Sequence, residues 1–467
     1  MSSNPIYQTV IVGGGFTGLF TALHLSHQHY PRSVILIEKE ERFCFKPLLY
    51  EYFSGEMNSE EVRPRYEELL QGSGIIFIQD SVQSIDLHQR EVKLTSGTGY
   101  NYSNLVLALG SITGYFGVEG AAENAFPFRT GEDAIAIDKH LRDCLQRAIQ
   151  IEEVEQRQNL LTVAVVGGGP SGVEMAATLA DLLPNWYAGL GGNPQEVQVY
   201  LIDHGSEILE GDINSVLRET AEDALQRRAV PVRLIMEAKA TAIRPDRLEY
   251  QRKNRTETLS AATTIWTAGT NTHSLIKQLA IPDEHRDKHG RLLVTPTLQL
   301  LDFPEVFAGG DCAAVKEHSF PPTAQVAYQQ GAAIARNLVA LAFGNKLQPA
   351  SINLRGTLLK LGIEESAANI FNTFEVTGEV GHLIRQGTYL ELLPTPVHNL
   401  KVTAEWLNDE IFNQHLHPHT TANVIKWVGG ALVGVIVARK LLQILGENQA
   451  EAKASQTSSS SGSLERF

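Results

Sequence analysis

The chain has 467 residues, of which 43% are hydrophobic and 20% are charged, and such a composition is ordinary for a globular enzyme. This length exceeds what one hydrophobic core usually organises, so it predicts two or three domains. The formal net charge of −14 argues against a nucleic-acid partner, because binding phosphates requires a basic surface. The three cysteines are far apart in the sequence, so we expect neither a zinc site nor a local redox disulfide, and no metal site is predicted.

The first predicted element is a buried parallel strand over residues 6–12, and a glycine-rich turn (GGGFTG, residues 13–18) leads from it into a helix that starts near Phe16. In this type of turn the first glycine permits the tight bend, the second lets backbone N–H groups approach a pyrophosphate, and the third lets the helix pack on the strand. The pyrophosphate then lies at a helix N-terminus, where free N–H groups and the helix dipole favour negative charge. The next strand, residues 33–37, ends at Glu38, whose carboxylate can accept hydrogen bonds from an adenosine ribose. The residues predicted to contact this first dinucleotide are Gly13, Gly14, Gly15, Gly18 and Glu38.

Short strands over residues 75–109 and a polar helical connector over 132–160 are predicted to follow. A second unit then repeats the plan of the first. Its predicted elements are a strand at 162–166, a GGGPSG turn at 167–172, a helix at 171–183, a loop at 184–196 and a strand at 197–202 that ends at Asp203.

The second turn predicts a second dinucleotide, contacted by Gly167, Gly169, Gly172 and Asp203. Asp203 would repel the 2′-phosphate of NADPH, so this unit is expected to favour NADH. One such turn alone is weak evidence. Two turns, each followed by its acidic residue, indicate a protein that holds FAD and a nicotinamide nucleotide at once and moves electrons between them.

Two downstream segments carry a resemblance to known families. Residues 306–311 (VFAGGD) form a short strand that ends in Gly-Gly-Asp, and here the chain resembles the flavoprotein pyridine-nucleotide reductases. Residues 321–331 (PPTAQVAYQQG) are similar to the A-Q-x-A-x-Q-Q segment of type II NADH:quinone dehydrogenases, as are residues 45–50 (FKPLLY), 128–130 with Asp133 and Ala134, and Glu174. Residues 50–57 (YEYFSGEM) resemble the cyanobacterial and plastid branch.

This resemblance implies an α/β fold of two Rossmann-like domains, with an NADH-binding domain (126–284) inserted in an FAD-binding domain (1–125 and 285–345). It implies that Asp311 binds the ribityl and phosphate of FAD, that Glu174 lies near the nicotinamide and the flavin, and that Gln325 lies at the quinone site. Tyr328 is expected to be either a quinone contact or a core aromatic. The family's quinone-site lysine is expected just after residues 361–362, where Ile363 stands and Lys360 is slightly displaced. Further cofactor contacts implied by the resemblance are Pro47, Ala108, Gly110, Gly269, Gly310 and Ala324.

The function implied is that of a non-proton-pumping NADH:quinone oxidoreductase, with plastoquinone, menaquinone or a biosynthetic naphthoquinone as the open choices of acceptor. A sulfide:quinone reductase that uses Cys144 and Cys312 is one alternative, and a nucleotide-binding redox sensor without turnover is another. For Glu174, the alternative is an ordinary glutamate favoured by the helix dipole.

The C-terminal part predicts a membrane association. Residues 427–438 (WVGGALVGVIVA) are uninterruptedly apolar, and a helix over 424–445 would be about 33 Å long, close to the ~30 Å hydrocarbon thickness of a bilayer. We therefore expect a docking region (346–420), a hydrophobic helix (421–445) that either spans the bilayer or inserts from one side, and a disordered tail (446–467). A buried helix in a homodimer is the alternative. No signal peptide is apparent, so the catalytic domains are expected to face the cytoplasm.

Overall fold

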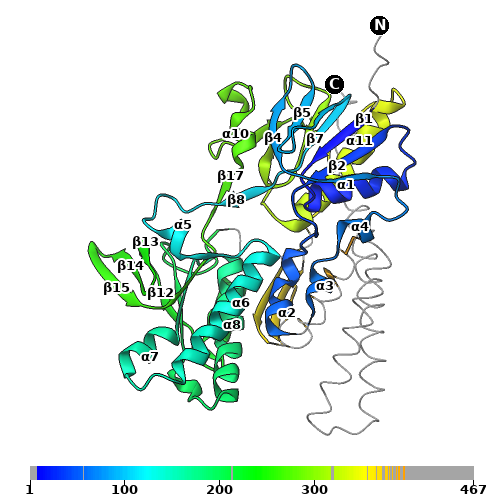
Figure 1. Ribbon diagram of the computed structural model, residues 1–467. Coiled ribbons are helices and arrows are strands. Elements are labelled where there is room, and N and C mark those ends of the chain that lie inside the picture. Colours follow the sequence, from blue (N-terminus) through cyan, green and yellow to red (C-terminus); the bar gives the residue numbers. More distant parts are fainter. Residues whose placement is uncertain are drawn as a thin grey trace, which may run out of the picture.

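The computed structural model describes residues 8–394, apart from residues 56, 212–213, 317–319, 355, 364, 371–373, 377, 379–380, 382–384, 386–387 and 390–392. The predicted hydrophobic helix (421–445), the tail (446–467) and the end of the predicted docking region lie outside the described residues. Most of the described chain forms two α/β units, which lie at the top and the lower left of Figure 1.

The first unit is built on a parallel sheet of five strands in the order β19-β7-β1-β2-β3. These strands are β1 (Gln8–Val12), β2 (Ser33–Glu38), β3 (Ile76–Gln79), β7 (Asn104–Leu107) and β19 (Val306–Ala308). Strand β7 is buried at every position, as are residues 9–12 of β1, because helices or loops cover both faces of a parallel sheet. An antiparallel meander of β4 (Val82–Asp86), β5 (Glu91–Leu94) and β6 (Gly99–Asn101) lies between β3 and β7 in the chain.

The second unit repeats this architecture. Its parallel sheet has the order β12-β11-β10-β16-β9, formed by β9 (Phe126–Pro127), β10 (Thr162–Val166), β11 (Gln198–Ile202), β12 (Arg233–Ile235) and β16 (Thr263–Trp266). A meander of β13 (Ala238–Arg244), β14 (Arg247–Arg252) and β15 (Arg255–Ser260) stands where β4–β6 stand in the first unit. The duplication predicted from the two glycine-rich turns therefore extends to every strand of the main sheets.

Two connections join the units. Strands β8 (Ser111–Thr113) and β17 (Thr270–Thr272) pair antiparallel and run between the units in Figure 1. After β17 the chain returns to the first unit through α10 (Ser274–Gln278), β18 (Leu292–Val294) and β20 (Ala313–Val315), of which β18 and β20 pair with each other. Strand β19 lies between β18 and β20 in the chain and forms the edge of the first sheet. The predicted insertion of the second unit into the first agrees with this path.

Helices pack around both sheets. Helix α1 (Phe16–His27) follows β1 and packs on α11 (Ala324–Ala342), and α8 (Pro170–Gly189) follows β10 and packs on β21. The other helices are α2 (Leu49–Ser54), α3 (Ser59–Val62), α4 (Tyr66–Leu69), α5 (Ala121–Asn124), α6 (Gly131–Ala148), α7 (Val154–Leu160) and α9 (Ser215–Gln226), with short 3-10 turns η1 (Lys46–Leu48), η2 (Pro194–Glu196), η3 (Asp283–His285) and η4 (Gly310–Cys312). A last antiparallel sheet comprises β21 (Gly356–Gly362), β22 (Glu365–Ile370) and β23 (Phe374–Val376).

One boundary differs from the sequence prediction. Helix α8 continues through Pro184 to Gly189, whereas the sequence predicted a loop from residue 184 onwards. Proline inside a helix removes a hydrogen bond, but Leu183, Pro184 and Tyr187 are all buried here. Burial of this face stabilises the helix beyond the point where the local signal predicts its end.

Candidate active site

The first glycine loop (residues 13–18) is tightly packed at its first and last glycines and open at Gly15, just before α1. Gly13 has a φ of +100°, and a Cβ there would collide with the carbonyl oxygen of Ala108. A Cβ on Gly18 would collide with the carbonyl oxygen of Gly13, whereas a Cβ on Gly15 would meet no described atom within 4 Å. Packing thus requires glycine at the outer two positions, and the middle glycine faces open space.

The second glycine loop (residues 167–172) has the same geometry. Gly167 has a φ of +120°, and its Cβ would lie 2.7 Å from the backbone nitrogen of Ala268. A Cβ on Gly172 would collide with the carbonyl oxygen of Gly167, and one on Gly169 would meet no described atom within 4 Å. Each loop therefore bends back on the strand end beside it and leaves its middle glycine accessible.

The two helices that begin at these loops suit an anion at their N-termini. Gly15 and Gly169 are the N-cap residues of α1 and α8, and neither helix has a side-chain cap or an acidic residue in its described first turn. Free N–H groups at a helix start, together with the helix dipole, favour a phosphate group there. The residues present thus fit a dinucleotide pyrophosphate at each loop.

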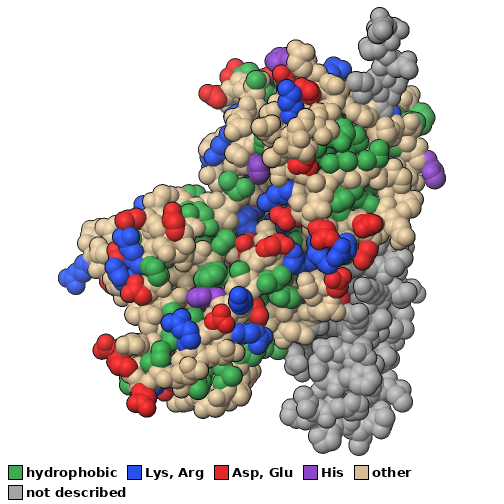
Figure 2. Space-filling view, in the orientation of Figure 1, with side chains coloured by type: hydrophobic (Ala, Val, Ile, Leu, Met, Phe, Trp, Pro, Cys, Tyr) green, Lys and Arg blue, Asp and Glu red, His purple; other side chains and the backbone are tan. Residues whose placement is uncertain are grey.

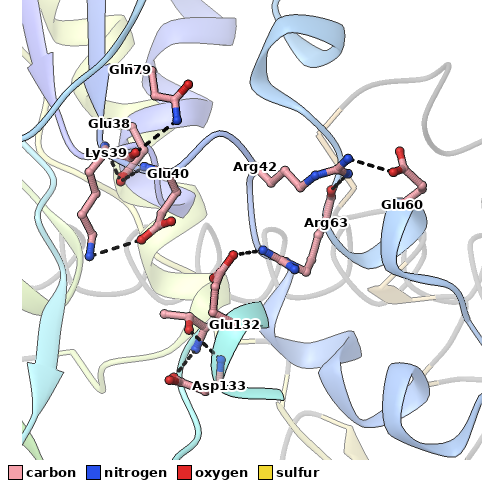
Figure 3. Close-up of polar contacts among 10 residues, drawn as sticks. Glu38, Lys39, Glu40, Arg42, Glu60, Arg63, Gln79, Glu132 and Asp133 are labelled. Atoms are coloured by element: carbon pink, nitrogen blue, oxygen red, sulfur yellow. Dashed lines mark hydrogen bonds and ion pairs between the residues drawn. The ribbon is translucent and has the colours of Figure 1, made fainter. Parts of the chain in front are cut away.

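Each loop is tied to the acidic residue at the end of the next strand. The Gly14 N–H donates to Oε2 of Glu38 over 2.7 Å. The Glu38 carboxylate also accepts from the N–H of Lys39, and Figure 3 shows these two residues. In the second unit, the Gly168 N–H donates to Oδ2 of Asp203, also over 2.7 Å. Both carboxylates therefore lie beside their glycine loops, where an adenosine ribose is expected.

Asp311 is held at the first unit by two side chains from other segments. The hydroxyl of Ser111 donates to Oδ2 of Asp311 over 2.7 Å, and Arg129 donates to the Ser111 hydroxyl over 2.7 Å. The preceding Gly310 has a φ of +74° and donates its N–H to Oε1 of Gln330 over 2.6 Å. These contacts bring η4, β8 and α11 together beside the first glycine loop, where Thr17 also donates to the carbonyl of Ala327 over 3.1 Å.

The start of α11 contacts the last sheet. Nε2 of Gln325 donates to the carbonyl of Gly356, the first residue of β21, over 3.1 Å. One turn later, Gln329 donates to the Asn353 carbonyl and accepts from the Asn353 N–H. Tyr328 points elsewhere: its half-buried ring packs edge-on against Phe20 of α1, with centroids 4.7 Å apart. This contact favours the packing alternative for Tyr328, while a quinone contact stays a prediction.

A buried charge cluster, formed by Glu51, Glu174, Lys360 and Arg385, lies between α2, α8 and β21. The backbone N–H of Lys360 donates to Oε1 of Glu174 over 2.8 Å, and Nζ of Lys360 lies 3.5 Å from Oε1 of Glu51. Arg385 forms an ion pair with Glu51 and donates to the carbonyl of Pro47 over 2.8 Å. Lys360, the residue noted as displaced from the family's lysine position, therefore contacts both acidic residues of this cluster, Glu174 through its backbone N–H and Glu51 through Nζ.

The two acidic residues of the cluster have opposite pKa shifts. Burial raises the pKa of Glu174 to about 7, with Glu51 adding to the rise and Arg385 opposing it. Burial also disfavours ionisation of Glu51, but Arg385 and Lys360 outweigh it and lower the pKa of Glu51 to about 2. Glu51 thus stays charged, and Glu174 can gain or lose a proton near neutral pH.

Charged side chains also gather on the surface where the two units meet, as Figure 2 shows for one face. Figure 3 draws one ion pair that crosses this boundary, between Arg63 of the first unit and Glu132 of α6. Gly131 makes room for it, because a Cβ there would collide with the Arg63 side chain. These contacts connect the two units.

The three cysteines are free thiols. Cys312 is buried and donates to the carbonyls of Gly309 and Leu107, and burial raises the pKa values of Cys312 and Cys44 to about 11. Such thiols stay protonated at neutral pH and are poor nucleophiles. In the described part of the chain, no group of His, Cys, Asp or Glu is arranged to hold a metal ion.

Comparison with known proteins identifies the family. The family model described as pyridine nucleotide-disulphide oxidoreductase matches residues 7–331. The chain belongs to this family. It is a FAD-dependent oxidoreductase, and despite the family's name its own cysteines form no disulfide.

Relatives within the family confirm the resemblance read from the sequence. The demethylphylloquinone reductase of Synechocystis sp. is 33% identical over 410 residues, which cover 85% of this chain and 95% of that protein. The alternative NAD(P)H-ubiquinone oxidoreductase C1 of Arabidopsis thaliana is 31% identical over 431 residues, with 85% and 79% covered. The type II NADH:quinone oxidoreductase of Staphylococcus aureus is 26% identical over 375 residues, with 78% and 90% covered.

Solved structures confirm the fold. NDH2 of Plasmodium falciparum, solved in complex with NADH, superposes with a TM-score of 0.77 at 19% identity and covers 87% of this chain and 99% of its own. The sulfide:quinone oxidoreductase of Aquifex aeolicus gives a TM-score of 0.67 at 20% identity, with 88% and 96% covered. At such identities the likeness extends to the fold and not to the substrate.

The structure groups the predicted residues into three places. Gly13, Gly15, Gly18, Glu38, Ala108, Gly310 and Asp311 surround the first glycine loop, and Gly167, Gly169, Gly172, Asp203 and Gly269 surround the second. Glu174 and Gln325 both contact β21, Gln325 at its first residue, Gly356, and Glu174 at Lys360, four residues later and about 13 Å away along the strand. Sequence reasoning missed Glu51 and Arg385, because their pairing across more than 300 positions leaves no local signal.

Proposed function

We propose that this chain is a type II NADH:quinone oxidoreductase that takes hydride from NADH and delivers two electrons to a membrane quinone. The observation that carries the proposal is the presence of two open glycine loops, each at an uncapped helix N-terminus and each beside a carboxylate, in one molecule. The first unit (1–125 and 285–345) holds FAD, and the second (126–284) binds NADH.

FAD, when bound, supplies the chemistry that accepts a hydride and passes on two electrons. The protein's own residues position the reactants. The N-termini of α1 and α8 bind the two pyrophosphates, Glu38 and Asp203 orient the two riboses, and Asp311, fixed by Ser111, orients the FAD chain. Asp203 also disfavours a 2′-phosphate, which gives the preference for NADH.

Glu174 is the group that can hold a proton for quinone reduction. The residue is 8% exposed, the pKa of its carboxyl group is raised to about 7, chiefly by burial, and the carboxylate accepts from the Lys360 N–H. Reduction of a quinone to a quinol consumes two protons as well as two electrons. A carboxyl group whose pKa burial has raised towards neutral pH is suited to hold and donate one of them.

Gln325 is the residue that places α11 against the quinone. Its hydrogen bond to Gly356 fixes the first turn of α11 beside β21, the strand that also contacts Glu174. The quinone side of the site therefore lies between the start of α11 and β21. The acceptors named for the relatives in Synechocystis and Arabidopsis support a quinone as the electron acceptor.

The test of this function is a two-step spectroscopic assay on the purified yellow protein. Anaerobic NADH should bleach the flavin absorbance, and a quinone should restore it. Plastoquinone, menaquinone and naphthoquinone analogues, compared by kcat/KM, identify the preferred acceptor, and parallel runs with NADPH measure the nucleotide preference. Protein that binds FAD and NADH but is not reoxidised by any quinone would be a sensor and not this enzyme.

A sulfide:quinone reductase is the less favoured candidate. The structural likeness to the Aquifex aeolicus enzyme supports only the fold, and burial raises the pKa of both thiols named for this alternative, Cys144 and Cys312, so that both stay protonated at neutral pH. Sulfide added in place of NADH should therefore leave the flavin oxidised.

For the membrane, we propose that residues 346–420 dock on the lipid surface and that 421–445 insert, with the catalytic domains facing the cytoplasm. Among the described residues, no helix combines the length and hydropathy needed to cross a membrane. The proposal rests on the apolar run at 427–438 and on the lipid solubility of long-tailed quinones. Deleting 421–467 should release the protein from vesicles and lower activity with a long-tailed quinone in liposomes, while activity with a short soluble quinone survives.

A homodimer in which the apolar run is buried is the second possibility for this segment. Light scattering of the full-length protein in detergent and of the truncated protein separates the two. If the truncated protein is monomeric but still binds vesicles, this result would favour burial of residues 421–445 in a subunit interface.

A further inference from the structure

Phe116 stands out among the apolar side chains of the described chain. It lies on the connection between β8 and α5, and its side chain is 71% exposed, the largest value among the exposed large hydrophobic residues. Its φ is +50°, a left-handed conformation that bulky residues adopt only under constraint. Strained residues of this kind concentrate at binding and catalytic sites.

The ring of Phe116 lies against two glycines. A Cβ on Gly269 would collide with the ring, and a Cβ on Gly114 would lie 3.2 Å from Cζ of the ring. Trp266 donates its Nε1–H to the Gly114 carbonyl over 3.0 Å and so fixes this segment on the second sheet. The ring is therefore held in place by its backbone and neighbours although most of its surface faces solvent.

The position of Gly269 places this ring at the second nucleotide site. Residues 267–269 follow β16 and run beside the second glycine loop, since Thr267 donates to the Gly167 carbonyl over 3.2 Å. In the second sheet, β11 and β12 lie on one side of β10, and β16 lies on its other side. The strand order therefore reverses between β10 and β16. Ligands of doubly wound sheets bind outside the carboxyl ends of the strands at such a switch.

The order of the chemical groups along NADH indicates which half of the nucleotide lies against the Phe116 ring. Asp203 at the end of β11 takes the adenosine ribose, and Gly169 after β10 faces the pyrophosphate. The remaining half of the nucleotide extends over the end of β16, towards Gly269 and Phe116. The corresponding glycine of the first unit, Gly110, would place its Cβ within 4 Å of no described atom, so an aromatic neighbour at this point is a feature of the second unit.

We propose that Phe116 is a positioning residue for NADH, an aromatic wall against which the nicotinamide half of the nucleotide packs. This inference rests on the proposed function, because it assumes that the second unit binds NADH. An exposed aromatic face is suited to a flat heterocycle, and its burial on binding favours the complex. The ring limits the freedom of the nicotinamide before hydride transfer.

The test compares Phe116→Ala with the parent holoenzyme in anaerobic stopped flow. The NADH concentration needed for half-maximal flavin reduction should rise roughly tenfold, the effect typical of losing one aromatic stacking partner. The rate at which a quinone reoxidises the reduced flavin should not change. Phe116→Tyr should restore NADH binding, and Phe343→Ala, which removes another exposed ring (61%) at the end of α11, should behave as the parent protein.

A second measurement separates the two halves of the nucleotide. ADP-ribose lacks the nicotinamide, so its inhibition constant should be the same in the parent and in Phe116→Ala. Unchanged NADH binding in Phe116→Ala would overturn the proposal, as would an equal loss of affinity for NADH and ADP-ribose, which would indicate distortion of the whole crevice. If Phe116→Ala does not retain FAD, Phe116→Leu, which keeps apolar volume without a flat face, replaces it under the same criteria. A parent protein that NADH does not bleach would instead refute the proposed function.

Discussion

The two glycine-loop units match in their loops and differ in what surrounds them. In both, the N–H that follows the first glycine donates to the acidic residue over 2.7 Å, and in both the middle glycine faces open space. The first unit, however, is closed by segments from far along the chain: β19 extends its sheet, η4 carries Asp311 to it, and α11 packs on α1. The fifth strand of the second unit, β9, is instead the first strand of that unit's own segment, and the exposed ring of Phe116 lies against Gly269 beside its glycine loop.

This difference indicates that the geometry of the glycine loop makes each site suitable for a dinucleotide. It does not determine how long the dinucleotide remains bound. A site enclosed by η4 and α11 suits a cofactor that remains bound through each turnover. A site with an exposed aromatic ring suits a substrate that must enter and leave. The same loop can thus serve FAD and NADH because the chain around it decides how far each is enclosed.

The largest effects are expected from valine substitutions at the two middle glycines, Gly15 and Gly169, and each should affect a different nucleotide. Gly15→Val fills the open space at the first loop, so the protein should lose FAD, become colourless and lose essentially all activity. Gly169→Val should keep FAD, while the KM for NADH rises roughly 10- to 100-fold, because hydrogen bonds to a charged pyrophosphate contribute about 1.5–3 kcal/mol. FAD content per chain and steady-state kinetics measure both outcomes.

Gly15→Ala and Gly169→Ala serve as controls, since each adds one carbon that would meet no described atom. Both should fold with the thermal stability of the parent. If Gly15→Val retains stoichiometric FAD, the assignment of the first unit is wrong.

Substitutions in the first turns of α11 should show whether this helix contributes to quinone reduction. Gln325→Ala should slow quinone-driven reoxidation of the flavin by roughly 100-fold if its amide acts on the reacting quinone. Flavin reduction by NADH should change little. Stopped flow measures the two half-reactions separately.

Gln329→Ala is the matched control, because Gln329 makes the same kind of tie from α11 to the chain before β21. Losing such a tie should cost less than about tenfold in either half-reaction. Equal losses for Gln325→Ala and Gln329→Ala would assign Gln325 a purely structural role.

The sequence predicted the framework of this molecule well. The strands at 33–37 and 162–166, the turn of each glycine loop and the insertion of one unit in the other are all present, because period, glycine spacing and β-branched runs are local signals. Membership of the reductase family and the resemblance to type II NADH:quinone dehydrogenases are likewise confirmed. The roles of the individual site residues stay predictions.

What the sequence could not predict depends on contacts between distant segments. The continuation of α8 through Pro184 reflects burial against neighbouring elements, which overrides the local preference of proline. The ion pair between Glu51 and Arg385 and the contact of the Lys360 N–H with Glu174 connect residues that share no spacing pattern. Phe116 is unremarkable in the sequence, and only its exposure and its contact with Gly269 indicate a role.

A smaller effect is expected at the acidic residue of the second loop. Asp203→Asn keeps an oxygen that can accept the Gly168 N–H but removes the charge that repels a 2′-phosphate. The ratio of kcat/KM for NADH to that for NADPH should therefore fall roughly tenfold, the size of one charge-assisted interaction. The equivalent change in the first unit, Glu38→Gln, should leave this ratio unaltered. A parent enzyme that prefers NADPH would contradict the assignment of Asp203.

The mildest expected effect is a pH dependence set by Glu174. Burial raises the pKa of this carboxyl group from 4.5 to about 7, so the fraction that carries a proton falls as the pH rises through 7. If Glu174 donates a proton to the quinone, reoxidation of the flavin should slow above pH 7 by at most about tenfold per pH unit. Stability should follow the same direction, because a folded-state pKa above the unfolded value contributes stability that is complete below about 4.5 and is lost as the pH rises through 7.

Glu174→Gln should flatten both profiles, while Glu60→Gln, a change at a half-exposed ion pair with Arg42, should flatten neither. Reoxidation that keeps its decline above pH 7 in Glu174→Gln would show that another group titrates, and this group is neither Tyr50 nor Tyr389, because these buried neighbours of Glu174 have pKa values raised far above this range.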